Sequence, residues 1–164
     1  MAKRILVALD RENPPSALLD LVVSAAAGGG ATVRLLEVAP TPQNLLDADN
    51  RVVMYADQEA ARVQADLLDE LRTVELQFGW MPVDSVVRFG DPAREILAEA
   101  EAFDADLIAM PTRCRRGVKR LFGSVAEAVG RRAPMAVAMV RELEEDAADL
   151  DEGRRPRGRR RAVR

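Results

Sequence analysis

The sequence predicts an α/β fold: a single doubly wound domain in which helices cover both faces of a five-stranded parallel sheet. Five short apolar runs alternate with four segments of helical length, which is the pattern of repeated β-α-β units. The chain has 164 residues, about one domain, and 48% of them are hydrophobic, so one core can form. Right-handed crossovers then restrict the topology to a few forms.

The apolar runs have the length and composition of buried parallel strands, each bounded by turn or loop residues. They are RILVAL (4–9), ATVRLLEV (31–38), VDSVVRF (83–89), ADLIAM (105–110) and MAVAMV (135–140).

The first helix is predicted after Pro14 and Pro15, with Asp10 or Asn13 as cap candidates, and the glycines at 28–30 end it. The second helix is the most regular element of the pattern. Its apolar residues recur at intervals of three or four, as on one helical face: Val53, Ala56, Ala60, Val63, Leu67, Leu71, Val74 and Phe78.

Capping signals bound the remaining helical segments. Asn50 is the predicted N-cap of the second helix and Gly79 its stop. Asp91 caps the third helix, with Pro92 at its first position. Ser124 and Glu127 have the spacing of a capping box, which predicts that the fourth helix starts there.

Charge divides the chain into a domain, residues 1–141, and a tail, residues 142–164. The domain holds 17 Lys/Arg and 20 Asp/Glu, whereas the tail holds seven arginines and seven acidic residues in an acidic and then a basic block. We expect the tail to be a disordered polyampholyte. The alternative is a binding module in which Arg154 to Arg164 contact nucleic acid or an acidic partner.

Composition excludes several function classes. The chain has no histidine, which removes the usual general base, Ser-His and Cys-His nucleophiles and most zinc sites. Neither a catalytic residue nor a metal ligand set is predicted. The one cysteine, Cys114, forms no internal disulfide, and a redox role for it is the less favoured interpretation. Without an apolar span or targeting signal, we expect a soluble cytoplasmic protein with no membrane partner.

Ligands of parallel sheets bind beyond the carboxyl ends of the strands. Asp10 follows the first strand and is either a ligand for an adenine amino group or ribose hydroxyl, or a loop cap. Gly123 and Ser124 begin a helix, where free N–H groups attract anions, although capping alone explains Ser124. The basic run, including Arg113, Arg115 and Arg116, is either an anion contact or, as we favour, a solvated loop.

These segments resemble the universal stress protein family. The resemblance rests on KRILVALD, VRLLEV, RFGDPAREI, ADLIAM and RRGVKRLFGSVAEAVGRRAPMAVAMVR, spread over residues 3–141. It implies the strand order 3-2-1-4-5 and homodimers that pair through the last strand, here Ala136 to Val140; an apolar edge strand would be covered in this way. The positions that match the family's nucleotide pocket are Asp10, Val38, Met110, Gly123, Ser124 and Val125.

The match departs from the family where ATP-binding members hold phosphate. Those members carry glycine, two residues, glycine, nine residues, then glycine and Ser or Thr. Pro111 and Cys114 stand where those members have their first two glycines. Eight residues, rather than nine, separate Cys114 from Gly123. Proline has no N–H to donate, and a side chain at Cys114 keeps a phosphate away from the backbone.

The sequence therefore predicts a non-enzymatic, homodimeric stress-response or regulatory protein with weak or absent nucleotide binding. The alternative is a sensor that binds ATP, with Mg²⁺, or another adenine nucleotide through Asp10, Val38 and the helix start at Gly123 and Ser124.

Overall fold

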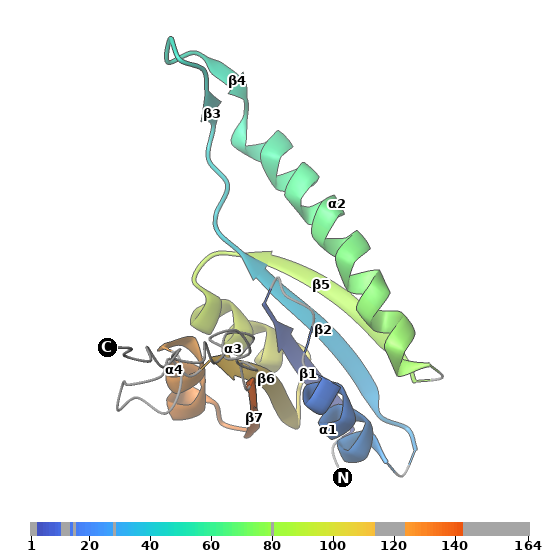
Figure 1. Ribbon diagram of the computed structural model, residues 1–164. Coiled ribbons are helices and arrows are strands. Elements are labelled where there is room, and N and C mark those ends of the chain that lie inside the picture. The colour runs from blue at the N-terminus through green and yellow to red at the C-terminus, as the bar shows by residue number, and fades with distance from the viewer. Residues whose placement is uncertain are drawn as a thin grey trace, which may run out of the picture.

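The computed structural model describes residues 3–10, 14, 16–27, 29–79, 81–113 and 124–142 (Figure 1). The helices are α1 (Ser16–Ala26), α2 (Ala56–Glu75), the 3-10 turn η1 (Leu76–Phe78), α3 (Pro92–Ala102) and α4 (Ser124–Arg132). The strands are β1 (Arg4–Leu9), β2 (Thr32–Ala39), β3 (Leu45–Leu46), β4 (Val52–Met54), β5 (Val83–Phe89), β6 (Leu107–Arg113) and β7 (Ala136–Glu142).

Five strands form one parallel sheet in the order β5-β2-β1-β6-β7. Counted along the chain, these are strands 3-2-1-4-5, so the predicted order is confirmed. The first strand along the chain, β1, lies in the centre of the sheet, and the last strand, β7, lies at one edge. The chain builds the sheet outward from β1 in one direction, then returns to β1 and builds in the other.

Helices pack on both faces of the sheet, as predicted (Figure 1). Alternate residues of each strand point to opposite faces, so Ile5 and Val7 belong to one core and Leu6 and Ala8 to the other. The first core includes the buried side chains of α1 and α2. The second includes those of α3 and α4. The strands thus hold two aliphatic cores apart.

The start of α3 follows the predicted capping pattern. The Asp91 carboxylate accepts a hydrogen bond from the backbone N–H of Arg94 at 2.9 Å, and Pro92 occupies the first helical turn. This satisfies one of the N–H groups that have no partner within a helix. Because Asp91 lies two residues after β5, the cap fixes the start of α3 at the carboxyl edge of the sheet.

Asp106 joins the start of β6 to the start of β1. Its carboxylate accepts hydrogen bonds from the backbone N–H groups of Arg4, at 2.9 Å, and Lys3, at 2.8 Å. These two hydrogen bonds lower the pKa of Asp106, that from Arg4 having the larger effect. The Asp106 carboxylate therefore aligns the neighbouring strands β1 and β6 at the amino-terminal edge of the sheet.

The region before α2 differs from the prediction. β3 and β4 form an antiparallel hairpin where the sequence predicted a loop and the beginning of the helix. Asn50 is therefore not the N-cap of α2: it lies in the hairpin turn with φ 62°, a conformation that asparagine tolerates. Val53 lies in β4, and the helix begins after Tyr55. The predicted stop is confirmed, because Gly79 ends η1 with φ 62°.

The ends of two further elements also differ. β6 starts at Leu107 and runs to Arg113, whereas the sequence predicted a strand over 105–110. Ser124 is the first residue of α4 rather than its cap, and the Glu127 carboxylate accepts a hydrogen bond from Arg131. The predicted helix start is thus confirmed, but the capping-box pairing is not the contact that Glu127 makes.

Candidate functional site

The strand order creates a switch point between β1 and β6, where the chain's connections leave in opposite directions. Pairing between these strands ends at Val7 and Ala109. Beyond that pair, β1 continues alongside β2 and β6 continues alongside β7. The two strands therefore separate at their carboxyl ends, which is where doubly wound sheets bind ligands.

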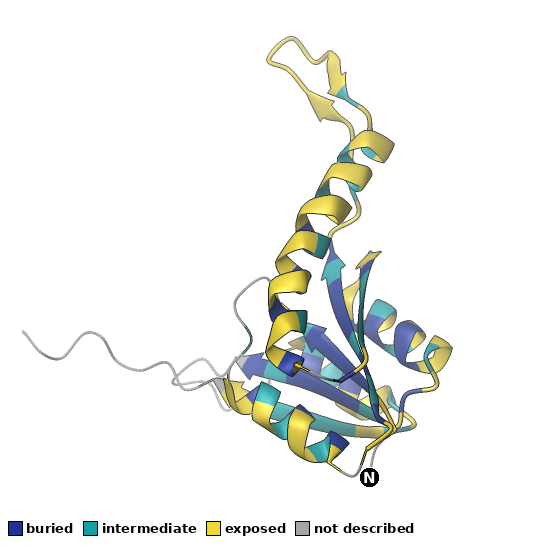
Figure 2. Ribbon diagram, turned by 90° about the vertical axis from the view of Figure 1, so that its right-hand side faces the viewer, coloured by how far each residue is buried: buried dark blue, intermediate teal, exposed yellow. Residues whose placement is uncertain are grey.

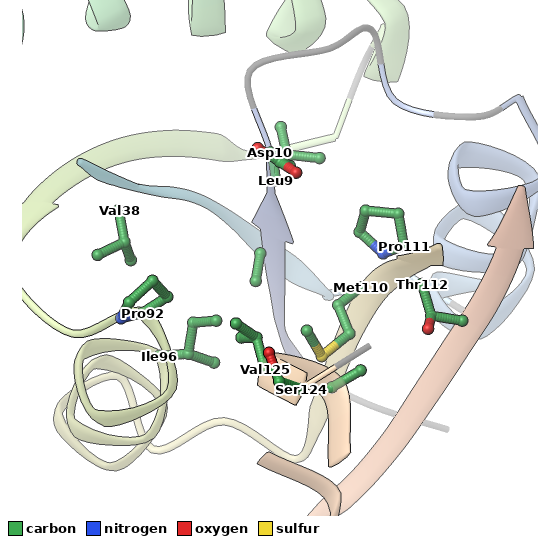
Figure 3. Close-up of a pocket in the computed structure, with 12 residues that line it drawn as sticks. Leu9, Asp10, Val38, Pro92, Ile96, Met110, Pro111, Thr112, Ser124 and Val125 are labelled. Atoms are coloured by element: carbon green, nitrogen blue, oxygen red, sulfur yellow. The ribbon is translucent and has the colours of Figure 1, made fainter. Parts of the chain in front are cut away.

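A cavity of about 270 Å³ lies at this point (Figure 3). Its volume is near the lower limit of the roughly 300–1,000 Å³ of small-molecule sites. It is lined by the ends of β1, β2 and β6 and by the starts of α3 and α4. The lining residues are Ala8, Leu9, Asp10, Val38, Pro92, Ile96, Met110, Pro111, Thr112, Ser124, Val125 and Ala126.

Five of the residues expected at the site meet around this cavity: Asp10, Val38, Met110, Ser124 and Val125. They come from four separate elements or their ends, and Figure 3 shows Asp10 at the end of β1, across from Ser124 and Val125. The fold therefore brings together residues that lie more than 100 positions apart in the sequence.

The remaining expected contacts cannot be placed around the cavity. Arg113 is the last residue of β6, and its side chain lies outside the described part of the chain. Cys114, Arg115, Arg116 and Gly123 lie outside the described residues altogether. The predicted anion contacts and the predicted role of Gly123 thus stay predictions.

The cavity combines apolar walls with a few polar groups. Val38, Ile96, Met110 and Val125 supply aliphatic and thioether surface from different directions (Figure 3). The Asp10 carboxylate is exposed at the end of β1. Such a combination suits a flat, mainly apolar ring that carries hydrogen-bond donors, because apolar walls bind the ring faces and a polar group fixes its orientation.

A second hollow continues from this cavity and shares Asp10, Val38 and Pro92 with it. Its lining adds Glu37, Pro40, Gly90 and Asp91. The carboxylate of Asp91 is the one that caps α3, and Glu37 is buried.

Pro92 belongs to the GDP segment, 90–92, that the strand pattern already placed at the carboxyl edge. Sequence reasoning missed Ile96 and Thr112 among the lining residues. Ile96 lies four residues after Pro92 and so on the same side of the first turns of α3, and that spacing was the available signal. Thr112 is buried in β6 and was assigned to a loop, since the predicted strand ended two residues earlier.

The strand extension changes the interpretation of the expected phosphate loop. Pro111 pairs in register with Val140, and Thr112 and Arg113 continue the pairing with β7. Pro111 is therefore part of an extended strand, whereas ATP-binding members of the universal stress protein family, which this sequence resembles, have the first glycine of their motif at this position. Pro111 is tolerated here because β6 no longer pairs with β1.

Among the described residues, no group of three or more acidic or cysteine side chains is arranged to hold a metal ion. None of the helices in this part of the chain has both the length and the apolar character needed to cross a bilayer.

Comparison with known proteins gives one consistent match. The model of the universal stress protein family covers residues 1–141. A universal stress protein from Methanothermobacter thermautotrophicus is 46% identical over 57 residues, which are 35% of this chain and 39% of that protein. The match thus spans about two fifths of that relative.

Solved structures agree on the fold. The hypothetical protein MJ0577 superposes with a TM-score of 0.68 at 20% identity, over 87% of this chain and 98% of its own. A universal stress protein in complex with cAMP gives 0.57 at 17% identity, over 85% and 97%. The Archaeoglobus fulgidus protein in complex with dAMP gives 0.52 at 18%, over 84% and 96%. With the family match over residues 1–141, the chain belongs to the universal stress protein family.

Proposed function

We propose that this protein is a non-enzymatic, cytoplasmic stress-response regulator that binds the nucleoside part of an adenine nucleotide weakly and lacks a strong grip on the phosphates. One observation carries the proposal. β6 continues as a strand through Pro111 to Arg113, where a glycine-rich loop would have to begin. The apolar cavity beside it is nevertheless formed.

The described residues suit the adenine and ribose groups. Val38, Met110 and Val125 would pack against the ring, and the Asp10 carboxylate would accept from an amino or hydroxyl group. Two relatives with this fold were solved with cAMP and with dAMP, which each carry one phosphate. These complexes support an adenine nucleotide as the ligand class without requiring a triphosphate grip.

The described residues offer few groups that could bind the phosphates. Pro111, which lines the cavity, has no N–H to donate. Ser124, exposed at the start of α4, is the described group best placed to meet a single phosphate. Among the described residues, a triphosphate with Mg²⁺ would therefore gain little beyond the contact that a single phosphate makes.

The regulatory, non-enzymatic part of the proposal rests on the composition. Without histidine, the chain lacks the residue that most often acts as general base near neutral pH. We therefore propose that the bound nucleotide is a signal rather than a substrate. The tail arginines, Arg154 to Arg164, lie outside the described residues, and nucleic-acid binding by them stays a prediction.

We also propose that two copies pair through β7. This strand is an edge of the sheet, and Ala136 to Val140 are all apolar. Their side chains are exposed or only partly buried. An unpaired apolar edge favours association with another strand, and a second β7 would satisfy the same row of backbone groups on both copies.

Replacing Val38 with tryptophan tests the pocket. The larger side chain stands at the end of β2, where it projects into both hollows, so we expect adenosine binding to weaken at least about tenfold. Val23→Trp is the matched control, because Val23 is 47% exposed on α1 and does not line the cavity. Isothermal titration calorimetry would measure both, and equal affinities of the two variants would contradict the proposed site.

A further inference from the structure

The hairpin β3–β4 and the first half of α2 project from the domain as an arm, which we define as residues 44–66. Figure 1 shows the arm extending beyond the carboxyl edge of the sheet. Figure 2 shows that most of its surface is exposed. The buried residues of α2 begin only at Leu67. The eleven helical residues before Leu67 project by about 16 Å at 1.5 Å per residue.

The arm carries most of the large hydrophobic side chains that are exposed in the described part of the chain. Seven such side chains are exposed, and five of them lie within eleven consecutive positions: Leu45, Leu46, Val52, Val53 and Tyr55. A cluster of this kind on a projecting element is typical of an interaction surface rather than of scattered surface residues.

Polar contacts give the arm a defined local structure. The Asp47 carboxylate accepts hydrogen bonds from the N–H groups of Asp49 and Arg51, both at 2.9 Å. Asn44 accepts one from the N–H of Ala56 at 2.8 Å, which ties the base of the hairpin to the start of α2. The apolar side chains are therefore presented by an ordered turn.

The pairing of the hairpin leaves its most exposed valine outside the ladder. Leu45 pairs with Met54 and Leu46 pairs with Val52, so Val53 is the extra residue of a β-bulge. Val53 is 63% exposed. An isolated two-stranded hairpin is marginally stable in water and has no core of its own. The apolar side chains of the hairpin are therefore available to a surface outside the arm.

The charge of the arm indicates the chemistry of that surface. Residues 44–66, all of which the structure describes, contain five acidic and two basic residues, a net charge of −3. One of the two arginines, Arg62, already contacts carboxylates of its own helix: it donates to Glu59 at 2.7 Å and to Asp66 at 2.9 Å. Asp49, in the hairpin turn, and Asp57, in the first turn of α2, are exposed. The arm thus presents apolar side chains together with exposed carboxylates.

A negative, partly apolar surface is complementary to a positive, partly apolar one. It would repel the phosphates of nucleic acids and the headgroups of anionic lipids. We propose that the arm docks onto a basic, partly apolar surface of another protein. Tyr55, 60% exposed between the hairpin and α2, is suited to be a central contact, because an aromatic ring buries a large area and tyrosine is enriched among residues that dominate binding.

The apolar part of the contact is tested with a fluorescent amphipathic peptide of leucine and arginine as the probe. In the double variant Val53→Thr, Tyr55→Thr, threonine suits both a strand and a helix N-cap but removes apolar area. We expect the dissociation constant of the peptide, measured by fluorescence anisotropy, to rise about tenfold or more. The matched control is Val23→Thr, Leu76→Thr, which changes the two exposed hydrophobic residues outside the arm and should leave the constant within about twofold.

The charged part is tested with the double variant Asp49→Asn, Asp57→Asn. Removing two negative charges from the arm should raise the dissociation constant about fivefold or more at low salt and make it less sensitive to added salt. Asp20→Asn, Glu70→Gln is the control, because it changes the net charge equally at two exposed residues outside the arm. We expect the control to change the constant by less than about twofold. A peptide with glutamate in place of each arginine should bind the wild type at least about tenfold more weakly.

Four results would overturn the proposal: no saturable binding of the arginine peptide at about 1 mM, arm variants that bind it like the wild type, controls that weaken it as much as the arm variants do, or equal binding of the glutamate peptide. Binding to vesicles of phosphatidylcholine and phosphatidylglycerol, or to duplex RNA, that the threonine arm variant loses would also overturn it, by assigning the arm to lipid or nucleic acid. The contact is independent of nucleotide binding, since no residue of the arm lines the cavity.

Discussion

We expect the replacement of Glu99 with alanine to lower the free energy of unfolding by about 3 kcal/mol. Glu99 lies on the inner side of α3 with only 2% of its side chain exposed, yet it carries a carboxylate. Its two oxygens accept hydrogen bonds from Arg34 Nη1, at 2.9 Å, and Arg88 Nε, at 2.7 Å. The carboxylate therefore joins α3 to β2 and to the edge strand β5.

Of the two arginines that Glu99 contacts, Arg34 is largely buried and has further partners. Arg34 is 24% exposed, also pairs with Asp84, and lies 4.3 Å from the centre of the Phe103 ring. The hydrogen bond to Asp84, and further that to Glu99, raise the pKa of Arg34, so its guanidinium stays charged. Alanine at position 99 would leave this cation without a buried partner and would open a cavity under α3.

Urea denaturation would measure the effect, with Glu101→Ala as the matched control on the same helix. Glu101 is exposed, so its replacement should change the free energy of unfolding by less than about 0.5 kcal/mol. Glu99→Gln should fall between the two, because an amide oxygen still accepts one hydrogen bond. Equal stabilities of the Glu99 and Glu101 alanine variants would show that the buried carboxylate does not hold α3 to the sheet.

We expect Leu71→Ala to lower the free energy of unfolding by about 3 kcal/mol as well. Leu71 is 2% exposed and lies in the core between α2 and the sheet, together with Leu67 and Val74. These residues are in the second half of α2. The loss combines the transfer free energy of the missing methyl groups with that of the cavity they leave.

Leu76→Ala is the control for this second substitution, since it makes the same chemical change five residues later at a side chain that is 82% exposed. We expect a change of less than about 0.5 kcal/mol, measured by the same urea titration. A large effect at Leu76, or a small one at Leu71, would mean that α2 packs on the sheet through a different face from the one described.

The first and last residues of a strand could be predicted where clear stop signals flank it. Arg4–Leu9 and Val83–Phe89 were both predicted with the bounds that the structure has, because Asp10 and Gly90 end apolar runs. The start of α3 was predicted from Asp91 and Pro92 for a similar reason. The local signal and the tertiary structure agree at these positions.

The hairpin could not be predicted, because its strands have only two and three residues. Val53 also has the spacing of the helical stripe that continues through Ala56, so periodicity assigned it to the helix. The length of β6 was missed because proline usually ends a strand. Pro111 is accommodated because β6 at that point has β7 as its partner and no longer pairs with β1.

The candidate site was predictable in part. Asp10 could be placed at the carboxyl edge from the strand pattern, but Val38 and Met110 were assigned through the family resemblance, since aliphatic residues at strand ends look like any others. Ile96 was missed because its role depends on how α3 is oriented over the sheet, and a sequence pattern does not specify that orientation. Its burial at the cavity wall is a tertiary property.

Calorimetric titration of the wild-type protein with adenosine, AMP and Mg-ATP tests directly whether the site binds the nucleoside end of the nucleotide without a strong contact to its phosphates. Each charge-assisted hydrogen bond to phosphate is worth roughly 1.5–3 kcal/mol, so a working phosphate grip would make Mg-ATP bind at least about a hundredfold tighter than adenosine. We predict affinities for adenosine and Mg-ATP that agree within about fivefold. Mg-ATP binding in the low micromolar range, with adenosine at least about a hundredfold weaker, would contradict the claim.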